Sequence, residues 1–496
     1  MNLAQILADA ARFFPARPAV LADGQETSYA GLEAESGRAA AGLAALGCAP
    51  GRLVGLCLPN CRQWLAAYFG IIKAGCAAVT LAAGLTGDEL RAALDDCRPA
   101  ALITSDAKLA ELGQRAGLPF LQTVIAPAGD MSWEALLALG GQGLAAIERG
   151  RDDLAAVLYT GGTTGTPKGV MLSHQNLLAS AHNVARQERS TETDRALCFL
   201  PLNHVFGQVH VMLSTILTAG SLSMLPAFDL DRVLDALERG GVTKLYAVPT
   251  IYVRLLAQPD IGRRLGAVRY TFSAAASMAQ ELVREWKQAT GLDIHEAYGM
   301  TESAAMVTYN HYHRHKVGSV GAPVGTVEVA ILDQQGRPVN RGQEGEICIQ
   351  GPNVMRGYLN RPLETQAAFW GPWLRSGDIG YLDDEGYLFI VDRLKDMIIT
   401  GGENVYPREI EELLFTLPEV EECAVVGLPD REYGERVTAA IKLKPGAGLE
   451  PEALKAFLRQ RLTPFKVPKA FHLVDDLPKS ATGKILKREL RRQLAD

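Results

Sequence analysis

The sequence predicts an α/β protein. We expect a large N-terminal domain of parallel βαβ subdomains plus a small β-rich subdomain, followed by a small α+β C-terminal domain. Short apolar strands alternate with amphipathic helices over the first two-thirds of the chain, the pattern of a parallel sheet covered on both faces. From about Gly318 short strands are separated by Gly, Asp, Asn and Pro turns, and from about Arg393 helices and strands mix again. The expected domains are therefore 1–392, with the β-rich subdomain at about 318–392, and 393–496.

The N-terminal elements follow from hydrophobic periodicity. Short apolar runs predict buried strands, and apolar residues three or four positions apart predict helices. In chain order we expect strand Leu53–Leu58, helix Gln63–Ala74, strand Ala78–Leu81, helix Thr86–Asp96, strand Ala100–Ile103, strand Ala155–Tyr159, helix Leu177–Gln187, strand Ala196–Leu200, helix Leu230–Gly240 and strand Lys244–Val248.

The two later regions are built from shorter segments. The β-rich subdomain should contain strands Val327–Leu332, Gly345–Gln350 and Gly386–Val391. The C-terminal domain should contain helix Pro407–Leu417, strands Val420–Leu428 and Arg436–Leu443, helix Pro451–Leu462 and a basic terminal helix.

Composition narrows the class of protein. A net charge of −6 and a pI near 5.9 argue against a broad nucleic-acid-binding face. The 8 cysteines are scattered without a C-x-x-C pair, which is typical of reduced thiols in a cytoplasmic protein. The N-terminus lacks the apolar core of a signal peptide. The stretch Cys198–Phe228 carries no charged residue, but Pro and Gly interrupt it, so we expect a buried helix and a core strand there and no transmembrane segment.

A Gly- and Thr-rich loop follows the strand that ends near Tyr159. The sequence Thr160-Gly-Gly-Thr-Thr-Gly-Thr-Pro-Lys168 offers backbone N–H groups, hydroxyls and one cation to an anion. Its spacing fits neither a Walker A loop nor the dinucleotide fingerprint G-x-G-x-x-G. The loop therefore predicts phosphate binding of another kind.

With its neighbours, this loop resembles the phosphate loop of the adenylate-forming superfamily, which includes acyl-CoA synthetases, peptide-synthetase adenylation domains and luciferases. Further segments stand in the order typical of that superfamily: Pro201-Leu-Asn-His-Val-Phe-Gly207, Glu296-Ala-Tyr-Gly-Met-Thr-Glu302, Gly345-Glu-Ile, Tyr358-Leu-Asn, Ser376-Gly-Asp-Ile-Gly380, Asp392-Arg-Leu-Lys-Asp396, Gly401-Gly-Glu-Asn404 and Lys479-Ser-Ala-Thr-Gly-Lys484. The likeness covers nearly the whole chain and is greatest to fatty-acid or aryl acyl-CoA ligases.

The resemblance implies an ATP-dependent acid–thiol ligase. Such an enzyme forms an acyl-AMP from a carboxylic acid, releases pyrophosphate and passes the acyl group to coenzyme A. The implied nucleotide-binding residues are Thr160, Gly161, Gly162, Thr163, Thr164, Gly165, Thr166 and Lys168 for the β- and γ-phosphates, Ala275, Ala276, Glu296, Ala297, Tyr298 and Gly299 for adenine, and Asp378 and Arg393 for ribose. Thr301 would meet the phosphate or the substrate carboxylate, and Glu302 would bind Mg²⁺.

The resemblance also implies that the C-terminal domain moves between the two half-reactions. Lys484 would neutralise charge between the carboxylate and the α-phosphate during adenylation. Lys395 would be the hinge, and Gly401, Gly402 and Glu403 would then line the thiol tunnel. Taken alone, the basic residues near Lys484 could equally be a solvated helix end.

The acyl group would be bordered by His204, Phe206, Val209, Tyr246, Val248 and Ala274, with His204 as a gate beside the carboxylate. These mostly apolar residues favour an aliphatic or aromatic acid over an amino acid. Asn203 and the Ser273-Ala-Ala-Ala-Ser277 segment depart from the pattern of many relatives and leave the shape of the pocket open.

Several alternatives stand beside the coenzyme A ligase. The chain could be a free-standing loader of the phosphopantetheine arm of an acyl or peptidyl carrier protein. It could also be a non-catalytic acyl- or nucleotide-binding protein, or a luciferase-like oxygenase. A monomer and a homodimer are both compatible with the sequence. The alternating histidines of His311-Tyr-His-Arg-His315 and the pair Cys57 and Cys61 are interpreted as structural rather than metal or redox sites.

Overall fold

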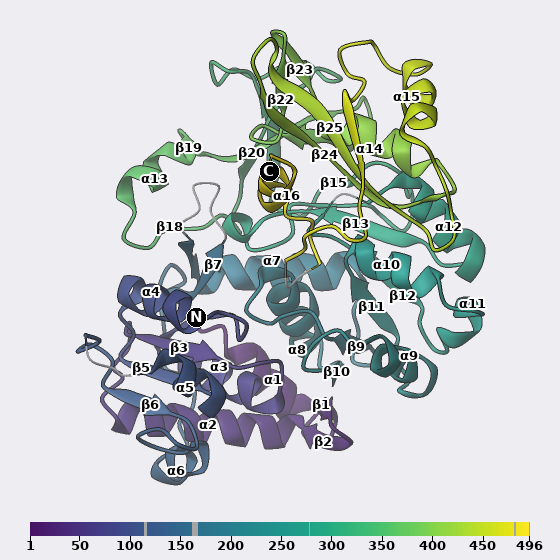
Figure 1. The fold of residues 1–496 in the computed structure, drawn as a ribbon. Coiled ribbons are helices and arrows are strands. Elements are labelled where there is room, and N and C mark those ends of the chain that lie inside the picture. Colours follow the sequence, from purple (N-terminus) through teal and green to yellow (C-terminus); the bar gives the residue numbers. More distant parts are fainter. Residues whose placement is uncertain (114–116, 161–166, 277, 481–482, 496) are drawn as a thin grey trace.

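In the computed structural model, residues 1–113, 117–160, 167–276, 278–480 and 483–495 are described. Within them the chain forms a mixed α/β architecture, with two large sheets in the N-terminal part and smaller sheets toward the C-terminus (Figure 1). The α/β class with a smaller α+β C-terminal region is as predicted. No helix in these ranges is long and apolar enough to cross a membrane.

The first large sheet has nine described strands, and its central members are parallel. In spatial order they are β15 (Ala322–Pro323), β14 (Thr308–Tyr309), β13 (Ile294–Tyr298), β12 (Tyr270–Ser273), β11 (Lys244–Ala247), β9 (Arg195–Cys198), β10 (Ser221–Met224), β1 (Pro18–Ala22) and β2 (Gln25–Ser28). Strands β11, β12 and β13 are almost entirely buried, as expected for parallel strands covered on both faces.

The second large sheet has seven described strands. Their order is β18 (Gly357–Tyr358), β8 (Lys168–Ser173), β7 (Leu154–Thr160), β4 (Ala77–Thr80), β3 (Leu53–Cys57), β5 (Ala101–Thr104) and β6 (Thr123–Ile125). Strands β7 and β8 form a hairpin in which Thr160 pairs with Lys168. The loop that they enclose, with Gly161, Gly162, Thr163, Thr164, Gly165 and Thr166, lies outside the described residues.

Helices cover these sheets. They are α1 (Gln5–Phe13), α2 (Tyr29–Ala45), α3 (Arg62–Lys73), α4 (Gly87–Cys97), α5 (Asp106–Leu112), α6 (Trp133–Leu139), α7 (His174–Gln187), η1 (Phe206–Leu213), α8 (Ser214–Leu217), α9 (Leu230–Arg239), α10 (Pro249–Leu256), α11 (Ile261–Arg264), α12 (Gln280–Thr290) and η2 (Thr301–Ser303). The helix and strand expected within Cys198–Phe228 are confirmed as η1 with α8 and as β10. Their helical part is a π-helix over η1, a rare form that frequently occurs at functional sites.

The β-rich region contains β16 (Glu328–Leu332), β17 (Gly345–Gln350), α13 (Pro362–Ala367), β19 (Phe369–Trp370), β20 (Trp373–Leu382) and β21 (Leu388–Arg393). The predicted strand Gly386–Val391 begins two residues late, at Leu388. Gly386 has a φ of +83°, so it forms the turn before the strand and does not extend it. Strand β20, which the sequence analysis did not find, pairs with both β17 and β21.

The C-terminal region has its own sheet and its own hydrophobic clusters. It contains β22 (Ile398–Thr400), β23 (Glu403–Val405), α14 (Pro407–Phe415), β24 (Val420–Asp430), β25 (Gly434–Leu443), α15 (Pro451–Arg459), β26 (Ala470–Leu473) and α16 (Lys487–Ala495). The predicted helix Pro451–Leu462 ends three residues early, but the order of elements is as expected. In Figure 1 the segment before α16 descends toward α10 and β11.

Candidate active site

The carboxyl ends of β11, β12 and β13 bring several of the predicted residues to one edge of the first sheet. Val248 follows β11, Ala274–Ala276 follow β12, and β13 ends at Tyr298. Since ligands of open parallel sheets bind outside the carboxyl ends of the strands, the motifs lie where such a fold places its site. Ala275, with a φ of +71°, has the left-handed backbone that turns the chain there.

Asp378 forms the centre of a polar group beside Tyr298. Its Oδ2 accepts a hydrogen bond from the Tyr298 hydroxyl at 2.7 Å, and its Oδ1 lies 3.2 Å from Nε of Arg393. Asp378 and Arg393 are also cross-strand partners between β20 and β21. Burial, reinforced by the Asp378 carboxylate, raises the pKa of Tyr298 well above its usual value. Thus the structure brings Tyr298, Asp378 and Arg393 into direct contact.

Glu296 is a buried carboxyl group near the C-terminal region. Burial raises its pKa to about 8, with the Arg408 charge acting in the opposite direction and Glu412 in the same one. Its Oε2 is buried and accepts no hydrogen bond from the described residues. Because a buried oxygen is costly without a donor, this atom is suited to an amine of a bound molecule.

Glu302 lies on η2 and is linked to the phosphate-loop hairpin. Its Oε1 accepts a hydrogen bond from the Tyr358 hydroxyl at 2.9 Å, and Nζ of Lys168 lies 5.0 Å from the centre of the Tyr358 ring. Burial raises the pKa of Glu302. Neighbouring Thr301 is 8% exposed. The sequence analysis did not predict the hydrogen bond from Tyr358 to Glu302, because the Tyr358-Leu-Asn motif indicated only the family and not which residue Tyr358 contacts.

Lys484 belongs to the C-terminal region and reaches the N-terminal sheet. The carbonyl of Gly483 accepts a hydrogen bond from Oγ1 of Thr250 at 3.3 Å. Loss of solvent lowers the pKa of Lys484 to about 7, assisted by the Arg393 charge and opposed by Asp378. Burial, with the Lys484 charge nearby, lowers the pKa of His204 to about 4. The Gly483 contact therefore places the Lys484 segment beside α10, at the carboxyl end of β11.

Lys484 makes no ion pair within the described residues, although two carboxylates influence it. A partly enclosed cation without a close counter-ion is unfavourable unless an anion joins it. Binding of an anionic substrate next to Lys484 would therefore be electrostatically favourable.

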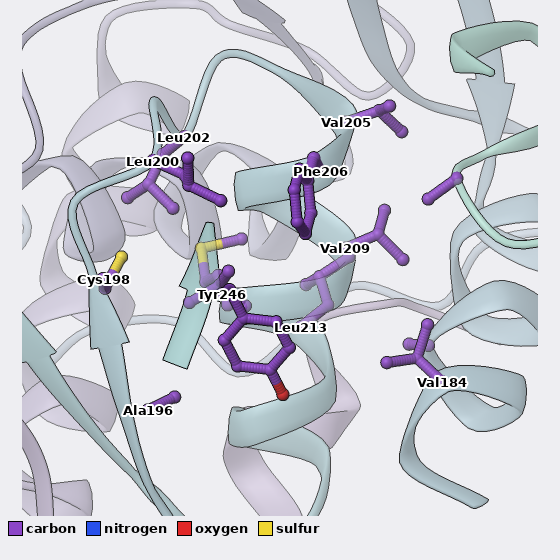
Figure 2. Close-up of a cluster of buried hydrophobic side chains, with 14 of the residues drawn as sticks. Val184, Ala196, Cys198, Leu200, Leu202, Val205, Phe206, Val209, Leu213 and Tyr246 are labelled. Atoms are coloured by element: carbon purple, nitrogen blue, oxygen red, sulfur yellow. The ribbon is translucent and has the colours of Figure 1, made fainter. Parts of the chain in front are cut away.

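The residues predicted to border the acyl group lie on η1 and on the sheet beneath it. Phe206, Val209, Tyr246 and Val248 are nearly inaccessible, while His204 and Ala274 are half-buried. Figure 2 shows Phe206, Val209 and Leu213 on η1 with the Tyr246 ring beside them. Nδ1 of His204 accepts a hydrogen bond from the Phe206 N–H at 3.2 Å, which orients the imidazole. Of these residues, Phe206 lies beside both His204 and Tyr246, with 6.5 Å between the Phe206 and Tyr246 ring centres.

The predicted hinge and thiol-tunnel residues lie elsewhere. Lys395 is exposed, between β21 and β22. Gly401, Gly402 and Glu403 are exposed at the turn of the β22–β23 hairpin, and the Gly401 N–H donates to the Tyr433 carbonyl at 2.8 Å. In this arrangement Lys484, rather than the glycine turn, faces the sheet edge.

Comparison with known proteins agrees with this arrangement. The family model for the AMP-binding enzyme matches residues 7–359, and that for the AMP-binding enzyme C-terminal domain matches residues 409–484. A long-chain-fatty-acid–CoA ligase of Bacillus subtilis is 34% identical over 525 residues, covering 99% of this chain and 94% of the relative. A feruloyl-CoA synthase of Amycolatopsis is 37% identical over 486 residues, covering 97% of each chain.

The fold of this chain also matches that of a solved structure. The crystal structure of ATP-bound MatB from Rhodopseudomonas palustris matches with a TM-score of 0.92 and 35% identity, covering 100% of this chain and 99% of that one. The relatives are acid–CoA ligases, so the carrier-protein loader and the non-catalytic protein are not favoured. The chain belongs to the AMP-binding enzyme family, as an ATP-dependent, AMP-forming acyl-CoA synthetase.

Proposed function

We propose that this enzyme activates a carboxylic acid whose acyl group is apolar and carries no second charge, using Lys484 for adenylation and a different face of its C-terminal domain for transfer to coenzyme A. The observation that supports this most strongly is the hydrogen bond from Oγ1 of Thr250 to the Gly483 carbonyl, which holds the Lys484 segment at the carboxyl end of β11. Within the described residues Lys484 makes no ion pair. The α-phosphate and the substrate carboxylate would supply the missing negative charge.

In the first half-reaction a carboxylate oxygen attacks the α-phosphorus of ATP, and the bond to pyrophosphate breaks. Tyr298 would stack on adenine, the free Oε2 of Glu296 would accept its exocyclic amine, and Asp378 and Arg393 would hold the ribose. The backbone of Ala275, Ala276, Ala297 and Gly299 would complete that pocket. Thr160 and Lys168 flank the loop proposed for the β- and γ-phosphates. Held donors and cations of this kind stabilise the charge that develops on the leaving pyrophosphate.

The residues present fit a magnesium ion. Glu302 offers one hard oxygen ligand, and Mg²⁺ is commonly bound by one carboxylate together with phosphates and waters. The ion would neutralise pyrophosphate charge. Thr301, on the same short helix, would contact the phosphate or the carboxylate.

In the second half-reaction the thiolate of coenzyme A attacks the acyl carbonyl, and AMP leaves. We propose that the chain divides at 392/393 and that rotation near Lys395 withdraws Lys484 and brings Gly401, Gly402 and Glu403 to the thiol path. The separate hydrophobic clusters of the C-terminal region support movement as a unit.

A screen of pyrophosphate release across carboxylic acids, with and without coenzyme A, tests the proposal. We expect ATP- and acid-dependent release, with acyl-CoA formed only when coenzyme A is present. Absence of release with every acid tried, from a folded protein, would contradict the proposed function.

Replacing Glu302 tests the magnesium ligand. Glu302→Gln keeps the shape and the Tyr358 contact but removes a negative charge, so the Mg²⁺ concentration for half-maximal pyrophosphate release should rise about tenfold or more. Tyr358→Phe, which keeps the ring and removes only the hydrogen bond to Glu302, should give a smaller rise in the same direction. An unchanged Mg²⁺ dependence of Glu302→Gln would exclude Glu302 as a ligand.

A further inference from the structure

The face of the first sheet that lies under η1 is organised in layers. Strands β11 and β12 pair in parallel register, with Lys244 opposite Tyr270 and Tyr246 opposite Phe272. Since alternate residues of a strand share a face, three layers follow from the carboxyl edge inward. The edge layer holds Val248 and Ala274, the second holds Tyr246 and Phe272, and the third holds Lys244 and Tyr270.

The edge layer lies at the site of adenylation. A side chain on Gly483, the neighbour of Lys484, would approach Cγ2 of Val248 to 3.0 Å. The substrate carboxylate, which must meet Lys484, therefore enters above Val248 and Ala274.

The second layer is filled by aromatic rings. We call Phe206, His210, Tyr246 and Phe272 the aromatic floor. The Phe272 ring centre lies 4.8 Å from His210, 5.6 Å from Phe206 and 5.9 Å from Tyr246. All four side chains are at most 4% exposed. Such packing leaves little room for an acyl chain to pass between the rings.

Buried polar contacts hold the aromatic floor in place. The Tyr246 hydroxyl donates to Oε2 of Glu188 at 2.5 Å, and Nδ1 of His210 lies 3.3 Å from Oε1 of the same carboxylate. Nζ of Lys244, in the third layer, lies 3.5 Å from Glu188 and 3.6 Å from Asp194. Because displacing Tyr246 would break a hydrogen bond to a fully buried carboxylate, the floor resists being pushed aside.

The depth above the floor limits the substrate. One two-residue repeat of a strand spans about 6.6 Å, and van der Waals contact with the rings takes up roughly 4 Å of it. We infer that the acyl site accepts short aliphatic acids, of roughly two to four carbons, and excludes long-chain acids. Below the rings Lys244 is paired with Glu188 and Asp194, and Arg269 is paired with Asp194. A second carboxylate on the substrate would therefore find no free cation in this network.

The limit on acyl-chain length rests on the proposed function, but an experiment can contradict the limit without contradicting that function. The specificity constant kcat/KM for pyrophosphate release is measured for acetate, propionate, butyrate, hexanoate, octanoate, benzoate and malonate. We expect a maximum among acetate, propionate and butyrate and a fall of about 100-fold or more by octanoate, since each poorly fitting methylene costs about 10-fold or more. Activity that is greatest with octanoate, benzoate or malonate would overturn the inference while leaving the ligase intact. No release with any acid would instead contradict the proposed function.

Removing a ring from the aromatic floor should shift the substrate preference toward longer acids. Phe272→Ala removes the ring that contacts the other three, and we expect the octanoate-to-butyrate ratio of kcat/KM to rise about tenfold or more. The milder Phe272→Leu should raise it less and protects the test against misfolding. Phe69→Ala, which removes an equally buried ring from α3, is the matched control and should leave the ratio unchanged. An unchanged ratio in folded Phe272 variants, or an equal rise in the control, would overturn the assignment of Phe272 to the floor.

Discussion

Lys484→Ala should abolish acyl-AMP formation yet still convert preformed acyl-AMP to acyl-CoA. The substitution removes the cation next to Gly483, whose carbonyl accepts the hydrogen bond from Thr250 at the edge of the first sheet. Losing one such stabilising interaction costs about 3–4 kcal/mol, or roughly 100- to 1000-fold in rate. Single-turnover pyrophosphate release measures the first half-reaction, and consumption of synthetic acyl-AMP with coenzyme A measures the second.

Arg488→Ala is the matched control for this experiment. Arg488 is exposed on α16, a few residues from Lys484, so its loss removes the same charge from the same region without emptying the site. Both half-reactions should stay close to wild type. If Lys484→Ala slowed both half-reactions equally, Lys484 would not be specific to adenylation.

Lys395→Pro should slow thioester formation while largely preserving adenylation. In the present arrangement Leu394, Asp396 and Met397 donate backbone hydrogen bonds to Gly377 or Arg393, whereas no backbone hydrogen bond from Lys395 is found in the described chain. Proline at this position therefore removes no such bond here, but it fixes φ where rotation is proposed. We expect thioester formation to fall roughly 10- to 100-fold, equivalent to about 1.4–2.7 kcal/mol of barrier.

Lys395→Ala separates the backbone from the side chain. It removes the ammonium group and leaves φ free, so thioester formation should be much faster than in the proline variant. The measurement is the pair of single-turnover rates used for Lys484. Unchanged rates for both half-reactions in Lys395→Pro would refute the hinge.

Much of the fold could be predicted because its helices and strands have strong local patterns. Predicted helix Leu177–Gln187, for example, is extended to His174 because Ser173 and Asn176 form a capping box. Strand order could not be predicted in the same way. The pairing of β1 with β10 joins residues about two hundred positions apart in sequence, and periodicity contains no information on such partners.

In the candidate active site, too, local motifs identified some residues, while contacts between distant elements could not be predicted. The motifs identified Tyr298, Asp378 and Arg393, and the structure places them in contact. The link from Tyr358 to Glu302 and the aromatic floor were not predicted, since they depend on register and on side chains from separate elements. Glu188, for instance, lies outside every motif, yet it holds Tyr246 and His210. Residues 161–166, at the centre of the phosphate loop, lie outside the described residues, so their phosphate-binding role stays a prediction from sequence.

The contact between Gly483 and Thr250 has a thermodynamic consequence. The segment that carries Lys484 can be regarded as a tethered ligand of the N-terminal sheet. Among its described residues, the hydrogen bond from Thr250 to the Gly483 carbonyl holds it there, with Val248 close by. So few contacts would not bind a free peptide, but a short covalent tether supplies an effective concentration on the order of millimolar. Weak intrinsic affinity combined with high local concentration lets the segment occupy the site often and leave it quickly. The proposed rotation, in which two faces of one domain meet the same intermediate in turn, needs an association of that kind.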